Sequence, residues 1–426
     1  MSATTSAAGA TPFPATGNPS APDTLSERIE VLDVLRGIAL LGMFFVHFSS
    51  RSTDPGGGFG LLYSRVVELF FVNRFFTIFA ILFGVGFAVQ LRRADARGDA
   101  FIPRFVRRLL ALAVFGFIAE AFFGFNVLLG YAIWGLPLLL VRRWSTKALV
   151  IALLISTTSP SIDLLTRATY ATVVGRAAHF DANRKADNAE RIQAMRTAAD
   201  GIRSTDYRTV IAARMRVLQV RYAPQHSFLM PAGAFTLFLI GFLGLRLGLF
   251  EDPRRHRRLI AGIMIFGTAS WAAWELVFPL HIAIPPEWPM PLRALSTFAT
   301  TQPFAIGSLS ADLAFTYIGA ILLLVAHNPA WLRRLGAFQI TGRMALTNYM
   351  LQVMILDFAF SNHGFALTIN AAYAPLSALA LFAVDVALSR WWLSRYQYGP
   401  LEWVWRSATY ARWQPMRRAA TVGDSY

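Results

Sequence analysis

Three polar side chains in the first long apolar segment have types and spacing suited to acid–base chemistry. Asp33 and Arg36 are three residues apart, so on a helix they are neighbours that can form an ion pair. His47 follows Arg36 by eleven residues, which places both on one helix face about 16 Å apart along the axis. A free imidazole has a pKa near 6.5, so His47 is a candidate general base. The alternative is an ion pair near one membrane surface and a histidine near the other.

Polar side chains recur in the later apolar segments, where each is energetically costly and therefore a candidate for function. Glu68 and Arg74 are six residues apart, so each is expected to find its partner on another helix. Asn348 and Gln352 lie one turn apart and can line a cavity together, or can instead hold the bundle through amide hydrogen bonds. The substrate-binding residues that this reasoning predicts are Glu68, Arg74, Glu120, Asn126, Arg343, Asn348 and Gln352.

Metal chemistry has little support in the sequence. The chain has no cysteine, which excludes disulfides, thiol catalysis and cysteine metal ligands. No two of its seven histidines are three or four residues apart, the spacing that places two ligands on one helix face. We therefore expect no metal and no haem. Gly84 and Gly86 lack the strand–turn–helix context of a nucleotide loop, and we interpret them as sites of close helix packing.

The composition indicates that these residues lie in a membrane protein. Hydrophobic residues make up 55% of the chain and charged residues 15%, whereas soluble domains average about 25% charged residues. Apolar runs long enough to cross about 30 Å of hydrocarbon predict an all-α, polytopic integral membrane helical bundle. About ten transmembrane helices are expected, at 31–50, 66–91, 104–123, 125–141, 145–163, 228–250, 258–280, 305–326, 342–360 and 367–392.

These spans divide the chain into two membrane halves of five helices each, with a long segment between them. The first residues are rich in Ala, Thr, Ser, Pro and Gly, which predicts a disordered cytoplasmic tail. They lack the basic and apolar regions of a signal peptide. The middle segment is predicted to be an extracytoplasmic loop, with an interfacial amphipathic helix near 206–222 or a solvated cap as the alternatives. The last segment is predicted to be a basic cytoplasmic tail. The five parts are 1–26, 27–163, 164–227, 228–392 and 393–426.

The distribution of arginine sets the expected orientation. The net charge is +16, and every basic residue other than Lys147 and Lys185 is an arginine. With ten spans, most arginine clusters fall on one side, which the positive-inside rule assigns to the cytoplasm together with both termini. We therefore expect a multi-pass protein of the bacterial plasma (inner) membrane, with membrane lipids as partners and no nucleic acid. The sequence carries no signal of an oligomeric state.

Four motifs resemble those of a known family. They are RIEVLDVLRGIALLGMFFVHF, RFFTIFAILFGVGF, GRMALTNYMLQ and YGPLEWVWR, and they look like those of the YeiB family in the order that this family shows them, from about residue 28 to 410. That family is in turn similar to the heparan-glucosaminide acetyltransferases and to acyltransferase family three. The resemblance implies a bundle of ten or eleven helices that moves acyl groups from cytoplasmic acyl-CoA to sugars outside.

The resemblance also assigns expected roles to the first helix. In acyltransferase family three, an Arg or Lys precedes a catalytic His by ten intervening residues, and Arg36 and His47 match this spacing. YeiB members usually carry Asn at the position of His47. The chain therefore departs from its nearer relatives in the direction of the acyltransferases, which favours a transferase reading.

Other positions depart from the YeiB pattern. YeiB proteins usually show a His near the end of the third helix and a GDIL at the start of the fourth. This chain has Glu120 near the first place and FNVL at the second, where Asn126 replaces the usual aspartate. If that pair acts in the relatives, this chain has changed or lost it. Glu68 and Arg74 match an acidic and a basic residue seen in the family.

The first hypothesis is an acyl-CoA-dependent membrane acyltransferase with an extracytoplasmic hydroxyl or amino acceptor, such as an envelope glycan. Arg36, oriented by Asp33, and the arginines of 104–108 would hold the phosphates of the donor acyl-CoA. His47 would act as general base or carry the acyl group itself. Asn348 and Gln352 would line the cavity.

The second hypothesis is a membrane transporter or a non-enzymatic envelope protein. Buried Glu68, Arg74 and Arg343 would also suit a translocation path, because ionisable residues within membranes often mark such paths. A transferase should depend on His47, whereas a transporter should depend more on Glu68, Arg74 and Glu275.

Overall fold

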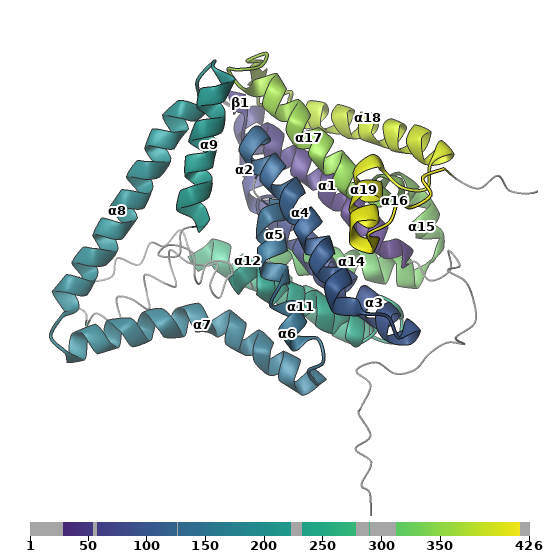
Figure 1. The fold of residues 1–426 in the computed structure, drawn as a ribbon, viewed down its shortest axis with the longest axis horizontal. Coiled ribbons are helices and arrows are strands. Elements are labelled where there is room, and N and C mark those ends of the chain that lie inside the picture. The colour runs from purple at the N-terminus through teal and green to yellow at the C-terminus, as the bar shows by residue number, and fades with distance from the viewer. Residues whose placement is uncertain are drawn as a thin grey trace, which may run out of the picture.

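The computed structural model of the chain is an almost entirely helical protein (Figure 1). It describes residues 29–53, 58–125, 127–222, 232–277, 289 and 312–417. The helices of the first half are α1 (Glu30–Ser49), α2 (Phe59–Phe70), α3 (Arg74–Arg97), α4 (Phe101–Phe123), α5 (Val127–Gly135), α6 (Leu138–Val141), α7 (Thr146–Val173), α8 (Ala177–Ile202) and α9 (Tyr207–Tyr222). Those of the second half are α11 (Ala232–Arg246), α12 (Arg257–Val277), α14 (Asp312–His327), α15 (Ala330–Arg334), α16 (Gly336–Arg343), α17 (Ala345–Phe360), α18 (Ala374–Arg395) and α19 (Pro400–Tyr410).

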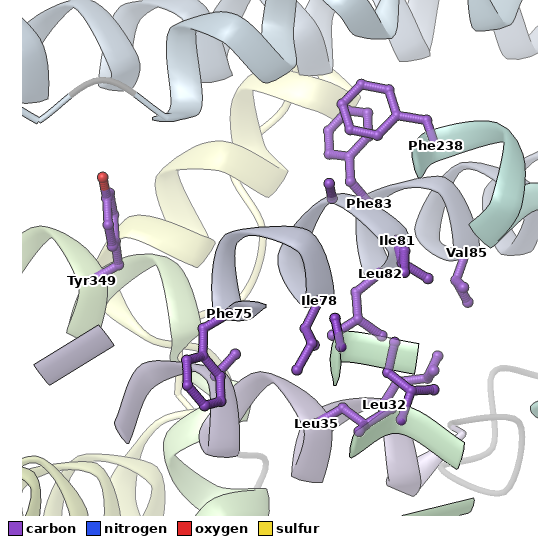
Figure 2. Close-up of a cluster of buried hydrophobic side chains, with 14 of the residues drawn as sticks. Leu32, Leu35, Phe75, Ile78, Ile81, Leu82, Phe83, Val85, Phe238 and Tyr349 are labelled. Atoms are coloured by element: carbon purple, nitrogen blue, oxygen red, sulfur yellow. The ribbon is translucent and has the colours of Figure 1, made fainter. Parts of the chain in front are cut away.

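Helix α1 lies in the middle of the bundle and packs against α3, α16, α17 and α18. Glycines allow these helices to approach closely. A Cβ atom added to Gly84 of α3 would overlap the backbone of Phe238 in α11, and one added to Gly241 of α11 would overlap the backbone of Ile81. Membrane helices pack through small residues in this way. Apolar side chains from α1, α3, α11 and α17 fill the interior around these contacts (Figure 2).

Helix lengths and exposed side chains indicate a membrane protein. Among the described residues, three segments are long and apolar enough to cross a membrane, and shorter apolar helices accompany them. The three segments are Glu30–Ser49, Phe59–Arg97 and Ala374–Arg395. Large apolar side chains such as Leu110, Leu154, Ile265 and Leu376 are more than half exposed, as expected of surfaces that face lipid. The all-α prediction is confirmed, whereas the number of ten transmembrane helices stays a prediction.

Three of the predicted spans are interrupted. The helix expected at 66–91 begins earlier as α2 and restarts as α3, because Asn73 adopts the left-handed conformation with φ of 66°. The segment 125–141 is divided between α5 and α6 next to Pro137, which cannot donate a backbone hydrogen bond. The segment 342–360 is divided at Met344 between α16 and α17.

The expected loop at 164–227 is largely helical. Helix α7 extends to Val173, and α8 follows it outside the bundle (Figure 1). The segment near 206–222 is helical, as α9, and packs on α4 and α8, whereas its amphipathic, interfacial character stays a prediction. The expected basic tail contains a helix that was not anticipated, α19, which packs against α4 and α17.

Two short strands tie together distant parts of the chain. Strand β1 (Ser52–Thr53) follows α1, and β2 (Ile369–Asn370) precedes α18; the two pair in parallel. Several predictions lie outside the described residues: the tail 1–26, Asn126, and the ends of three expected spans at 228–231, 278–280 and 305–311.

Candidate functional site

Helix α1 carries the predicted polar face. The Arg36 guanidinium lies 2.8 Å from Asp33 Oδ1, so the predicted ion pair is present. The Asp33 side chain is 2% exposed and that of Arg36 is 30% exposed. His47 is buried near the other end of the helix. We name the two ends of the bundle after these residues, the Arg36 end and the His47 end.

Close backbone contact between α1 and α16 brings Arg343 to the Arg36 end. A Cβ added to Gly37 would overlap the backbone of Phe338, and one added to Gly342 would overlap the backbone oxygen of Asp33. Because neither glycine carries a side chain, the two helices touch along this line. The residue after Gly342 is Arg343, which therefore enters the same cavity as Arg36 and Asp33.

A cavity of about 500 Å³ lies at the Arg36 end. Its polar wall holds five arginines and two carboxylates: Arg36, Arg93, Arg108, Arg343, Arg406, Asp33 and Glu402. The excess of positive charge suits a ligand that carries several negative charges. The rest of the wall is mainly apolar and aromatic, with Met43, Phe76, Phe79, Leu82, Phe83, Leu112 and Leu128 among its residues. The cavity thus joins a polyanion-binding wall to an apolar one.

Helix α19 holds Arg108 in this cavity. The guanidinium of Arg108 lies 4.1 Å from the centroid of the Trp405 ring, and the Trp405 indole donates a hydrogen bond to the Arg108 carbonyl at 2.9 Å. Arg108 also lies 3.8 Å from the position of an added Cβ at Gly86. Gly86 therefore faces the cavity, whereas Gly84 provides the helix packing that was expected of both.

Glu402 joins α19 to the start of α17. Its carboxylate accepts hydrogen bonds from the backbone N–H of Leu346 at 2.6 Å and of Thr347 at 3.1 Å, and from the Thr347 hydroxyl at 2.6 Å. Burial raises the pKa of Glu402, and these hydrogen bonds oppose that rise in part. Glu402 thus satisfies amide groups that have no partner within α17.

His47 meets Gln352 at the other end of α1. The Nδ1 atom of His47 lies 3.3 Å from Nε2 of Gln352 on α17, and the edge of the Phe125 ring packs on the imidazole. Neither His47 nor Gln352 lines the cavity, but Met43 does, and it lies one helical turn before His47. The cavity therefore approaches the His47–Gln352 pair without including it.

Asn348 holds helices together and does not line the cavity. Its amide donates hydrogen bonds to the Thr341 carbonyl at 3.2 Å and to the Ser389 hydroxyl at 2.9 Å, so it links α16, α17 and α18. Although Asn348 and Gln352 lie one turn apart, only Gln352 reaches His47. The amide hydrogen bonds of Asn348 hold the bundle together and do not face the cavity.

The remaining predicted residues do not gather at one site. Glu68 is 65% exposed and pairs at 2.8 Å with Arg65 of its own helix, so the expected partner on another helix is wrong for this residue. Arg74 is buried at the start of α3. Glu120 is buried and pairs with Arg221 of α9 at 2.8 Å.

A second buried ion pair at the His47 end was missed by the sequence analysis. Arg214 of α9 lies 2.6 Å from Asp357 of α17, and both side chains are at most 5% exposed. The Ser361 hydroxyl donates to the same carboxylate at 2.7 Å, and His363 lies 3.2 Å from its other oxygen. An acidic residue in an apolar helix was the available signal. Its partner lies 143 positions away, which no local pattern reveals.

Metal ligands do not cluster in the described part of the chain, where no group of three or more His, Asp and Glu side chains could hold a metal ion. The site therefore consists of a cationic cavity with an apolar extension and a neighbouring histidine–glutamine pair.

Known proteins match the two parts of the chain that build this site. Residues 28–190 match the family described as heparan-alpha-glucosaminide N-acetyltransferase, catalytic, and this range contains all of α1. Residues 245–412 match the family described as a protein of unknown function, DUF418, and this range contains α16, α17 and α19. Escherichia coli strain K12 protein YeiB is 27% identical over 90% of this chain and 96% of its own length. Together these matches support a YeiB-family protein that is related to the heparan-alpha-glucosaminide N-acetyltransferases.

Other relatives extend over similar lengths. Bacillus subtilis strain 168 protein YxaH is 27% identical over 94% of this chain and 99% of its own length. A 39.9 kDa protein in the amylase 3′ region of Bacillus acidopullulyticus is 28% identical over 93% of this chain and 97% of its own length. No solved structure matches the chain. The YeiB membership and the relation to the acetyltransferases predicted from the four motifs are confirmed.

Proposed function

We propose that this YeiB-family protein is a membrane acyltransferase that uses acyl-CoA and transfers the acyl group to a hydroxyl or amino acceptor, such as an envelope glycan. One observation carries the proposal: an arginine-lined cavity extends along an apolar wall to within one helical turn of His47. The match of the first half to an acetyltransferase catalytic family supports the same reaction class.

The cavity suits the two chemical parts of an acyl-CoA. Its phosphates would bind the arginines, chiefly Arg36, Arg108 and Arg343, through charge-assisted hydrogen bonds. Asp33 would orient Arg36 through the ion pair that α1 already forms. The pantetheine arm would follow the apolar wall toward Met43 and bring the thioester next to His47.

In the proposed step, His47 removes the proton of the acceptor hydroxyl or amine as its oxygen or nitrogen bonds to the thioester carbonyl carbon. The carbon–sulfur bond then breaks, and CoA leaves as a thiolate that takes up a proton. Gln352 would hold the imidazole ring of His47 in place through the contact between its amide nitrogen and Nδ1 of His47. No metal or haem takes part in this step.

The proposed topology places the Arg36 end in the cytoplasm, where acyl-CoA is made, and the His47 end on the outer side. The protein would be multi-pass in the bacterial inner membrane, with both termini cytoplasmic and lipid around its exposed apolar side chains. A transport path through Glu68 has less support, because Glu68 is exposed and paired with Arg65.

Acetyl-CoA binding to the purified full chain in detergent tests the proposal. Loss of one charge-assisted contact in Arg343→Gln should weaken binding about 10- to 100-fold. Arg65→Gln is the matched control, because Arg65 does not line the cavity and is 57% exposed. If neither acetyl-CoA nor a longer acyl-CoA binds to the wild type at saturating concentration, the proposed function is overturned.

A further inference from the structure

Tyr349 lines the cavity and carries a buried hydroxyl without a partner in the described part of the chain. The residue is 5% exposed, and its ring lines the cavity from α17. Its hydroxyl oxygen has no hydrogen-bond partner among the described residues. Figure 2 shows the ring projecting from its helix with the hydroxyl at its tip, clear of the other labelled side chains. A buried hydroxyl without a partner has lost its hydrogen bonds to water without replacement, so this position is unfavourable unless something binds there.

Another tyrosine of the same cavity shows the contrast. The hydroxyl of Tyr131 donates a hydrogen bond to the Phe76 carbonyl at 2.7 Å, so its hydrogen-bonding capacity as a donor is used within the protein. Tyr349 and Tyr131 line the same cavity. Of these two, only Tyr349 keeps a donor for a ligand.

The position of Tyr349 marks the junction between the cavity and the His47–Gln352 pair. On α17, Tyr349 lines the cavity and Gln352 lies three residues further on. On α1, Met43 lines the cavity and His47 lies four residues further on. On each of these two helices, the cavity-lining residue and the residue of the His47–Gln352 pair are therefore about 5–6 Å apart along the helix axis. Tyr349 therefore lies on the side of the cavity that is nearest in sequence to the pair on both helices.

We propose that the Tyr349 hydroxyl donates a hydrogen bond to the carbonyl oxygen of the bound thioester. This inference rests on the proposed acyl transfer. The phosphates would bind at the arginine wall, and the two amides of the pantetheine arm lie between the phosphates and the thioester. The thioester carbonyl at the end of the arm is therefore the acceptor that would come nearest to Tyr349 and the His47–Gln352 pair. Negative charge grows on that oxygen as the acceptor attacks, and a fixed donor then stabilises it further. Tyr349 thereby selects acyl-CoA over ligands that lack the carbonyl.

Two ligands that differ only at the carbonyl test this contact. Acetyl-CoA and its thioether analogue S-ethyl-CoA are titrated against the purified full chain in detergent. The wild type should bind acetyl-CoA about 3- to 10-fold more tightly, the value of one hydrogen bond. In Tyr349→Phe this preference should fall to less than about 2-fold, with S-ethyl-CoA affinity unchanged. In the control Tyr131→Phe, the preference should remain.

The unliganded variants provide a second measurement. Tyr349→Phe removes a hydroxyl without a partner and should unfold at the wild-type temperature or above it, whereas Tyr131→Phe removes a formed hydrogen bond and should unfold at a lower temperature. A wild-type preference that persists in Tyr349→Phe would overturn this inference and leave the proposed function intact. Failure of both ligands to bind the wild type would overturn the proposed function, and this inference with it.

Discussion

The two ends of α1 differ in how their charged side chains are arranged. At the Arg36 end, five arginines and two carboxylates surround a cavity, so positive charge is in excess where a ligand can bind. At the His47 end, each of the buried carboxylates Glu120 and Asp357 lies against an arginine of α9. There each of these carboxylates has its counter-charge within the protein. The same residue types therefore serve binding at one end and helix attachment at the other.

This difference follows from what each end must do. A buried charge without compensation is costly, so ion pairs inside a bundle persist where both partners are fixed by packed helices. Excess charge beside a cavity is tolerated because water and ligand can reach it. The arrangement predicts that substitutions at the two ends change different quantities, which can be measured separately.

The largest effect is expected at His47. His47→Asn should lower acyl transfer about 100- to 10,000-fold, because it removes the proposed general base. Acetyl-CoA affinity should stay unchanged, because His47 does not line the cavity. Both are measured on purified protein, by release of CoA and by ligand titration. His256→Asn, on the segment before α12, serves as the control, and equal transfer rates in all three proteins would remove His47 from the mechanism.

The next largest effect is expected at the buried ion pair. Asp357→Asn leaves Arg214 buried without its counter-charge and should lower the free energy of unfolding by about 3–5 kcal/mol. Glu68→Gln breaks the exposed ion pair with Arg65 and should cost less than about 1 kcal/mol. Unfolding in detergent and proteolysis of α8 and α9 provide the measurements. If Asp357→Asn and Glu68→Gln lowered the free energy of unfolding equally, the ion pair between Arg214 and Asp357 would not be what attaches α9 to α17.

Salt should change ligand affinity at the Arg36 end but not stability at the His47 end, and this effect should be smaller than the two above. Raising the salt concentration from about 0.05 M to 0.5 M shortens the range of electrostatic attraction at accessible sites. Acetyl-CoA affinity should therefore fall several-fold, because the arginine wall attracts its phosphates. The stability difference between the wild type and Asp357→Asn should stay constant, because that pair is buried. A salt-independent affinity would show that the arginines do not contact the phosphates.

The smallest effect is expected at Glu402, where burial raises the pKa of the carboxyl. A carboxyl whose pKa is higher in the folded state stabilises the fold below its ordinary pKa, and this contribution disappears as pH rises through the folded-state pKa. The wild type should exceed Glu402→Gln in stability by about 1 kcal/mol near pH 4, because the neutral carboxyl keeps its contacts to α17 without the cost of a buried charge. The difference should shrink toward neutral pH. A stability difference between the wild type and Glu402→Gln that is constant from pH 4 to 7 would contradict a raised pKa of Glu402 in the folded state.

Local spacing predicted the parts of the site that lie on one helix. The Asp33–Arg36 pair and the burial of His47 on α1 follow from periodicity, because side chains three or four residues apart are neighbours on any helix. Spacing failed where two partners lie on different helices. Asn348 and Gln352 share a face, yet their hydrogen bonds go to different neighbours. Glu68 found its partner within its own helix.

The hydropathy pattern also could not predict where the expected spans are interrupted. An apolar run shows that a segment is buried or faces lipid, but it does not show the backbone conformation of a single residue. Asn73, with its positive φ, divides one run into α2 and α3. The YGPLEWVWR motif identified the family, but its role in holding Arg108 and capping α17 required the position of α19.

The sequence by itself determined an all-α protein with long apolar helices, the polar face of α1 and membership of the YeiB family. These follow from composition, helical period and short motifs, all of which are local. Only the tertiary structure decided that arginines from α1, α3, α4, α16 and α19 line one cavity and that Tyr349 faces it. The physical reason is that contacts between helices depend on close approach at residues such as Gly37 and Gly342, whose effect appears only when the partner backbone is in place.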